Sequence, residues 1–169
     1  MFELKILSKA SIPAALQKAE RYRLLSEPHQ AASICLDILR IEPDNQEALI
    51  MLLLSHTDKF KNQLYPAFDM AMEILARLSS KHCKLYYRGI VNERRAKAHL
   101  DKGGPGSSEL AHDWYLKAMA DYEQALKNCS PGNEDAALRW NTCARILNEN
   151  PHLRPTDERQ EVQVTDGYE

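Results

Sequence analysis

Apolar side chains recur at intervals of three and four residues along most of this chain, which is the spacing of one face of an α-helix. The clearest example is a run of residues that share one helical face: Ala31, Ile34, Cys35, Ile38 and Leu39. The interior shows no convincing pair of segments in which apolar and polar residues alternate as they do in paired strands. The pattern therefore predicts an all-α fold.

Capping and helix-breaking residues divide this pattern into about seven helices. Serine, aspartate and asparagine favour the position before a helix, and proline favours its first turn or the residues beyond its end. Short connections between the segments predict antiparallel neighbours, in a bundle or as stacked helical hairpins. The segments expected to be helical are one that follows Ser11 and Pro13, then 28–42, 46–57, 66–78 and 81–101, one that carries Trp114 and Leu126, and 133–148.

Two of these regions have a distinctive composition. The segment from Ala48 to Leu54 is apolar on every side, so we expect several neighbouring helices to bury it. The run from Gly103 to Ser108 contains three glycines and a proline, which predicts an exposed, flexible loop between the fifth and sixth helices.

These signals predict three parts: an N-terminal extension over residues 1–11, a helical-repeat domain over residues 12–149 and an acidic C-terminal tail over residues 150–169. From Thr156 onward the tail holds five acidic residues against one arginine. Val162 and Val164 alternate with polar residues, so one hypothesis places the tail in a groove of its own or of a neighbouring chain. A solvated, disordered tail is the alternative.

The stretch from Ala15 to Leu49 resembles a tetratricopeptide repeat, which is a helical hairpin of roughly 34 residues. Tyr22 lies where the first helix of that motif has an aromatic residue. Ala31 lies where the two helices cross closely, and Pro43 ends the second helix at the usual offset. The resemblance therefore covers a complete hairpin.

Later segments resemble the same motif. Ala118, Tyr122 and Ala125 match the small–aromatic–small pattern of a second helix, and Gly89 suits the close-packed glycine of a first helix. The third repeat departs from the motif by an insertion that holds the glycine loop. Other departures replace large motif residues in the first repeat, at Ala15, Lys18 and Cys35.

The resemblance implies a right-handed stack of three helical hairpins and a capping helix, with the first helices lining a concave groove that holds a peptide. An apolar centre flanked by arginines suits a peptide with apolar anchors and acidic neighbours. If the ends of the chain cover the centre of the groove, its apolar residues are core instead. The residues expected to bind the partner are Arg23, Ile50, Leu54, Tyr86, Ile90, Arg94 and Arg145, beside Leu16, Glu20 and Thr142.

Composition narrows the class of protein. The 169 residues carry a net charge of −2, whereas nucleic-acid-binding domains are usually strongly basic. The first residues lack the basic and apolar runs of a signal peptide, and the longest apolar run is too short to span a bilayer. Four scattered cysteines form no C-x-x-C pair, which indicates reduced thiols and a cytoplasmic protein without membrane contact.

No set of residues points to catalysis, a metal or a cofactor. His82 and Cys83 are adjacent, but neighbouring helical residues diverge by about 100°, and the other histidines and cysteines are scattered. Cys35 and Cys143 fall on apolar helical faces, where a cysteine acts as a small hydrophobe rather than a nucleophile. The glycine loop lacks the Gly-Lys-Ser/Thr ending of a phosphate-binding loop. We therefore expect no enzyme activity.

A basic cluster occupies the fifth helical segment, where seven lysines and arginines face two acids. Such a cluster is usually a solvated face, and a patch for an acidic protein is the next alternative. Tyr86 and Tyr87 lie within it, so an RNA-binding surface is a further alternative. Our prediction is a protein–protein interaction module or scaffold, and the alternatives are an RNA-binding helical repeat and a self-associating structural subunit such as a homodimer.

Overall fold

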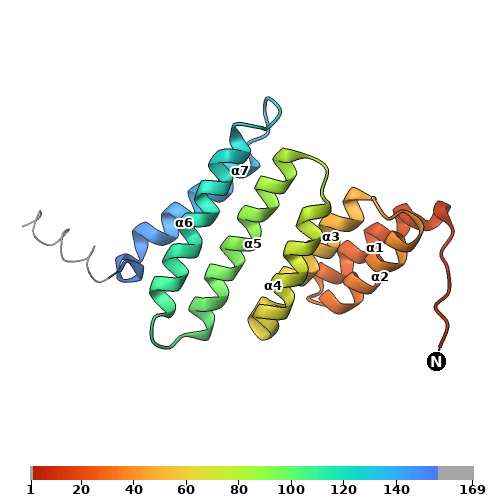
Figure 1. Cartoon of the computed structure of the whole chain (residues 1–169), viewed down its shortest axis with the longest axis horizontal. Coiled ribbons are helices and arrows are strands. Elements are labelled where there is room, and N and C mark those ends of the chain that lie inside the picture. The colour runs from red at the N-terminus through yellow and green to blue at the C-terminus, as the bar shows by residue number, and fades with distance from the viewer. Residues whose placement is uncertain (1, 156–169) are drawn as a thin grey trace, which may run out of the picture. The chain divides into compact units, whose positions relative to one another are not determined.

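The computed structural model describes residues 2–155. Helices make up 78% of these residues, and the described range contains no strand, so the predicted all-α fold is confirmed. No helix between residues 2 and 155 combines the length and the apolar content that a membrane span requires. The seven α-helices are α1 (Ile12–Leu24), α2 (Pro28–Ile41), α3 (Gln46–Thr57), α4 (Phe60–Arg77), α5 (Lys81–Lys102), α6 (Ser107–Leu126) and α7 (Asp135–Glu149) (Figure 1).

Contacts divide the chain into two compact units, one up to Ser80 and one from Lys81. The first unit contains α1 to α4 and the second contains α5 to α7. Short 3-10 helices precede α1, at Lys9–Ser11, and follow α7, at Pro151–Leu153. The hypothesis that the acidic tail docks in a groove concerns residues 156–169, which lie outside the described residues.

The first unit is built around α3, which packs against α1, α2 and α4. Asn45 caps this helix, because its side-chain oxygen accepts a hydrogen bond from the Ala48 amide at 3.0 Å. Four apolar residues on one broad side of α3 are buried, and they are Ala48, Leu49, Leu52 and Leu53. The prediction that several neighbours bury this helix is confirmed, and its predicted range agrees with the observed one.

Polar bonds tie the end of α4 to the start of α3. The Ser79 amide donates a hydrogen bond to the Gln46 side chain at 2.8 Å, and the Arg77 guanidinium donates to the Pro43 carbonyl at 2.6 Å. Because the end of one helix meets the beginning of the other, α3 and α4 run antiparallel.

The predicted start of α4 lies inside a longer element. The sequence places it near Pro66, but the helix begins at Phe60 and is kinked at Gln63, whose φ and ψ are −138° and 49°. Pro66 has no amide hydrogen to donate to the carbonyl four residues earlier, and its ring crowds that carbonyl. Gln63 therefore separates a short first segment from the main helix, which begins directly after it and carries Pro66 in its first turn, as the sequence predicts.

The turn between α1 and α2 uses an unusual backbone conformation. Ser26 has a φ of 60°, and it is the one non-glycine residue with a positive φ among the described residues. The Glu27 amide donates to the Tyr22 carbonyl at 2.8 Å, and the Ser26 amide donates to the Arg23 carbonyl at 3.0 Å. This pair of bonds is a Schellman motif, in which glycine normally takes the left-handed position.

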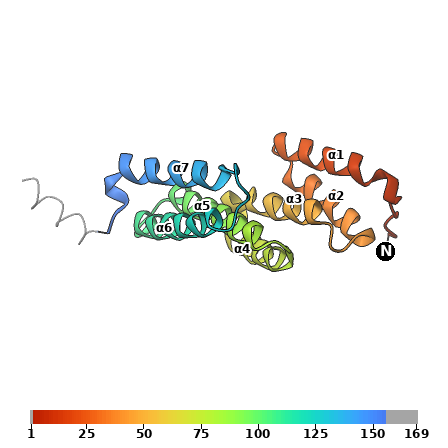
Figure 2. The same ribbon diagram turned by 90° about the horizontal axis from the view of Figure 1, so that it is seen from above.

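The second unit is built on the long antiparallel pair α5 and α6. Arg88 of α5 contacts Asp121 of α6, and Arg95, two turns farther along α5, contacts Trp114 of α6. Residue numbers rise along α5 where they fall along α6, so the two helices are antiparallel. The two helices approach closely at Gly89, because a Cβ atom there would lie 2.6 Å from Cδ1 of the buried Tyr122 ring. In Figure 2, α7 covers one side of this pair.

The boundaries of two other segments are shifted. The exposed loop between α5 and α6 is confined to residues 103–106, because Ser107 and Ser108 already belong to α6. Beyond α7, Leu153 is buried although the sequence places it in the tail. Its 3-10 helix packs on α6 and α7, so the fold of the second unit continues past residue 149.

Replacing Gly89 with alanine tests the close approach of α5 and α6. Alanine is favoured over glycine in a helix by about 1 kcal/mol, but overpacking a filled core costs typically about 1–3 kcal/mol or more. Because Tyr122 is fully buried, we expect the free energy of unfolding to fall by about 1–2 kcal/mol in a denaturant titration. Lys97→Ala, at an exposed position of α5, is the control and should change little. A Gly89→Ala protein of unchanged stability would contradict this packing.

Replacing Ser26 with glycine tests the turn after α1. Glycine adopts the left-handed conformation without the steric cost of a side chain, although it makes the unfolded chain more flexible. We expect Ser26→Gly to raise the free energy of unfolding by about 0.5–1 kcal/mol. Ser33→Gly, at an exposed position inside α2, should lower it instead, and a loss of stability in both variants would argue against the left-handed turn.

Candidate binding sites

The seven residues predicted to bind a partner are divided between the two units. Arg23, Ile50 and Leu54 lie in the first unit, and the second unit holds the others: Tyr86, Ile90, Arg94 and Arg145. Each group therefore has to be judged by its surroundings within its own unit.

In the first unit, α1 and α3 lie in contact, and the three predicted residues come from these two helices. Ile50 and Leu54 are one helical turn apart, so they share a side of α3, and both are half-buried. The Arg23 guanidinium forms two hydrogen bonds with Asp58, at 2.7 and 3.3 Å, and a longer one to the Met51 sulfur at 3.8 Å. We call Arg23, Ile50 and Leu54 the α1–α3 face.

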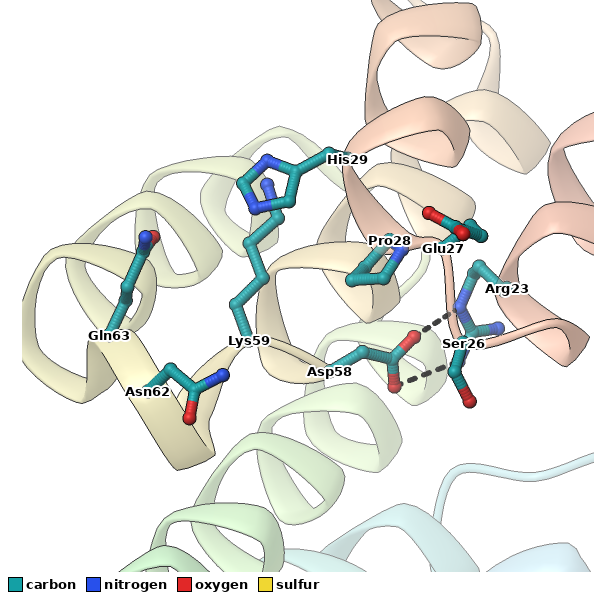
Figure 3. Close-up of a pocket in the computed structure, with 9 residues that line it drawn as sticks. All are labelled: Arg23, Ser26, Glu27, Pro28, His29, Asp58, Lys59, Asn62 and Gln63. Atoms are coloured by element: carbon teal, nitrogen blue, oxygen red, sulfur yellow. Dashed lines mark hydrogen bonds and ion pairs between the residues drawn. The ribbon is translucent and has the colours of Figure 1, made fainter.

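An open pocket of about 460 Å³ lies beside Arg23, at the ends of the first unit's hairpins (Figure 3). One wall comes from the turn between α1 and α2, and the other comes from the turn between α3 and α4 and from the first residues of α4. Four of its side chains are ionised or ionisable in addition to Arg23: Glu27, His29, Asp58 and Lys59. The remaining lining residues are Ser26, Pro28, Asn62 and Gln63.

The field around this pocket is positive on the side of Lys59. Burial lowers the pKa of the Lys59 ammonium. The nearby His56 ring is half-buried, and its pKa falls from 6.5 to about 4 because of burial first and then because of Lys59 and His29. Asp58, the nearest acid in the sequence, is already bound to Arg23.

In the second unit, a polar network joins the three helices. The Tyr122 hydroxyl of α6 donates a hydrogen bond to Glu93 of α5 at 2.5 Å, and Arg139 of α7 donates to the same carboxylate at 3.1 Å. Burial, followed by the charge of Glu93, raises the pKa of Tyr122, so this hydroxyl stays protonated. The Glu93 carboxylate thus holds α7 against the α5–α6 pair.

The predicted residues of the second unit have different surroundings. Ile90 is 2% exposed and belongs to the core, so it offers almost no surface to a partner. Tyr86 is half-buried, and its ring lies 6.0 Å from that of Tyr122 and 5.1 Å from that of Tyr87. Arg94 is half-buried and already has an interaction partner, whereas Arg145 is exposed on α7.

Part of the basic cluster of α5 is used inside the second unit. The Arg88 guanidinium donates to Asp121 at 2.9 Å, and Asn92 donates to the other oxygen of that carboxylate at 2.8 Å. The Trp114 ring has two cations over it, with Arg95 at 4.0 Å and Lys117 at 4.1 Å from its centroid. These arginines stabilise the pairing of α5 with α6.

Among the described residues, no three histidine, cysteine, aspartate or glutamate side chains lie close enough together to hold a metal ion. Cys35 and Cys143 are fully buried, and burial raises the pKa of each thiol to about 12. Both thiols therefore stay protonated, and the prediction that they act as small hydrophobes of the core is confirmed.

The polar pocket of the first unit was missed by the sequence reasoning. Its residues come from two turns that are about 30 residues apart, and no local motif links them. A signal did exist, because each turn follows the first helix of a predicted hairpin. Hairpins that stack in register bring such turns together, so the polar residues of both turns could have been paired.

No protein-family model, no curated protein and no solved structure matches this chain at a significant level. The site therefore has to be interpreted from its own geometry.

The depressed pKa of His56 predicts how stability depends on pH. As the pH falls from about 6.5 to 4, the unfolded chain binds a proton on this ring that the folded chain does not, so folding stability is lost in that window. After discounting for the solvent that screens a half-buried ring, we expect about 1–2 kcal/mol. Denaturant titrations at pH 7 and pH 4.5 should show a smaller loss for His56→Gln than for the wild type. Equal losses would mean that His56 titrates normally.

Proposed function

We propose that this chain is a cytoplasmic protein–protein interaction module, built as a tetratricopeptide-like stack of helical hairpins, that holds a partner and performs no chemistry. The observation that carries the proposal is the α1–α3 face. Two apolar side chains on one side of α3 are left half-buried there, next to an arginine whose orientation is fixed by Asp58.

Packing at small residues supports the tetratricopeptide-like part of the proposal. Ala31 and Ala118 have no exposed surface, and Gly89 lies directly against the Tyr122 ring. These are the positions where that repeat needs a small side chain opposite a large one. The parallel course of α1 and α3 also fits a stack of hairpins, because Arg23 near the end of α1 meets Asp58 at the end of α3.

The surroundings of this face indicate the chemistry of the partner. Ile50 and Leu54 are one helical turn apart. They suit a partner with two apolar side chains, either one turn apart on a helix or at alternate positions of an extended peptide. Lys59 lines the pocket beside Arg23, so its positive charge favours an acidic residue on the Arg23 side of those anchors.

The second unit gives less support to an RNA partner. An RNA-binding surface needs aromatic rings that are free to stack with bases, together with unpaired cations. Trp114 is already covered by Arg95 and Lys117, and Arg88 is bound to Asp121. A protein or peptide partner is therefore the better proposal.

Peptide selection tests the proposed function. A random peptide display library is selected on the full chain, and the affinity of enriched peptides is measured by fluorescence anisotropy. We expect peptides with apolar anchors beside acidic residues. Ile50→Asn should weaken them about tenfold or more, because a buried aliphatic side chain contributes about 1.5–3 kcal/mol.

Leu36→Asn is the matched control, since Leu36 is 55% exposed on α2 and lies away from the α1–α3 face. Thermal melts confirm that both variants are folded. Failure to enrich any peptide, or equal binding by the Ile50→Asn variant, would overturn the proposal. Tight binding of a labelled single-stranded oligonucleotide that weakens steeply with salt would favour the RNA alternative.

A further inference from the structure

We propose that the pocket between the two turns of the first unit is a binding site for a phosphate group. The site shares Arg23 with the α1–α3 face and uses the same Lys59 charge, but it needs neither Ile50 nor Leu54, so loss of peptide binding in Ile50→Asn and loss of phosphate binding in Lys59→Gln are separate outcomes. All residues that line the pocket lie between Arg23 and Gln63, so the pocket belongs entirely to the first unit.

The charges that line the pocket leave one cation without compensation. Arg23 and Asp58 neutralise each other through their paired hydrogen bonds. The Lys59 ammonium forms no hydrogen bond or ion pair with any other described residue, although the side chain is half-buried. Glu27, the other acid of the pocket, has its carboxylate on the Arg23 side in Figure 3 and away from Lys59.

Lys59 and His29, which come from the two turns, lie side by side in the pocket. Figure 3 shows Lys59 extending its ammonium toward the His29 ring, with the amides of Asn62 and Gln63 on the adjoining wall. An ammonium, an imidazole and two carboxamides can all donate hydrogen bonds. Donors that are supplied by two separate turns around one pocket suit a tetrahedral phosphate, which accepts from several directions, better than a planar carboxylate.

Two further observations fit an anion at this place. Burial first, and then the charges of Lys59 and His29, lower the pKa of the half-buried His56 ring, so the positive field of the pocket reaches this neighbour, and an anion bound there would offset it. Ser26 also lines the pocket in its left-handed conformation. Strained backbone of this kind is retained more often at ligand sites than elsewhere.

The experiment is a titration of the full, isotope-labelled chain with sodium phosphate at constant ionic strength, followed by amide chemical shifts. We expect the amides of His29, Gln30 and Asn62 to shift in a saturable way. Lys59→Gln should weaken binding about tenfold or more, because a hydrogen bond to a charged group contributes about 1.5–3 kcal/mol. His29→Gln is a second variant that should also weaken it.

Lys61→Gln is the matched control, because Lys61 is exposed on the same helix and does not line the pocket. Equal phosphate binding by Lys59→Gln and the wild type, the same shifts with chloride, or no saturable shift would each overturn the site. A short phosphoserine peptide and its unphosphorylated form distinguish the sources. Stronger binding of the phosphopeptide than of free phosphate assigns the site to a modified side chain, and the reverse assigns it to a free phosphate compound.

Discussion

Close approach of neighbouring helices, at positions that only alanine or glycine can occupy, is the constraint on which each unit depends. In the second unit, Gly89 lets the Tyr122 ring lie directly against the backbone of α5. This contact sets the distance between α5 and α6, and the polar groups along the pair are then within bonding reach. The Tyr122 hydroxyl meets Glu93, and Glu93 binds Arg139 of α7. A wider gap would break both bonds to Glu93. The loss would be large, because a carboxylate that is shielded from water and has no donors costs several kcal/mol.

The same logic applies in the first unit, where Ala19 and Ala31 have no exposed surface. With α1 and α2 held closely, α3 can contact both, and Arg23 reaches Asp58 at the end of α3. This ion pair is partly exposed, so it contributes little to stability by itself. Its effect is to hold the Arg23 and Asp58 side chains of the pocket in one orientation.

The sequence predicted features that depend on local chemistry and missed those that depend on tertiary neighbours. The range of α3 follows from the Asn45 cap and from a run that is apolar on every side, and both signals are local. The main segment of α4 begins after Gln63, close to the predicted start at Pro66, whereas the short segment from Phe60 has no local start signal and was missed. Ile90 was expected at a groove from its position in the repeat, yet it is buried, because the repeat register does not show which neighbours cover a residue. The pocket could not be read from either of its turns alone.

Packing and binding therefore have different locations in the first unit. Small residues in the middle of the helices satisfy the packing constraint, and they tolerate little change in volume. The turns at the helix ends are free of that constraint, and they hold the left-handed Ser26, the kink at Gln63 and the uncompensated Lys59. Lys59 lies between the end of α3, where a cation is favourable to the helix dipole, and the start of α4, where it is unfavourable, so the two effects oppose each other. The proposed phosphate would bind to this half-buried cation, so the ends of the hairpins, rather than their packed middles, are where we place a charged ligand.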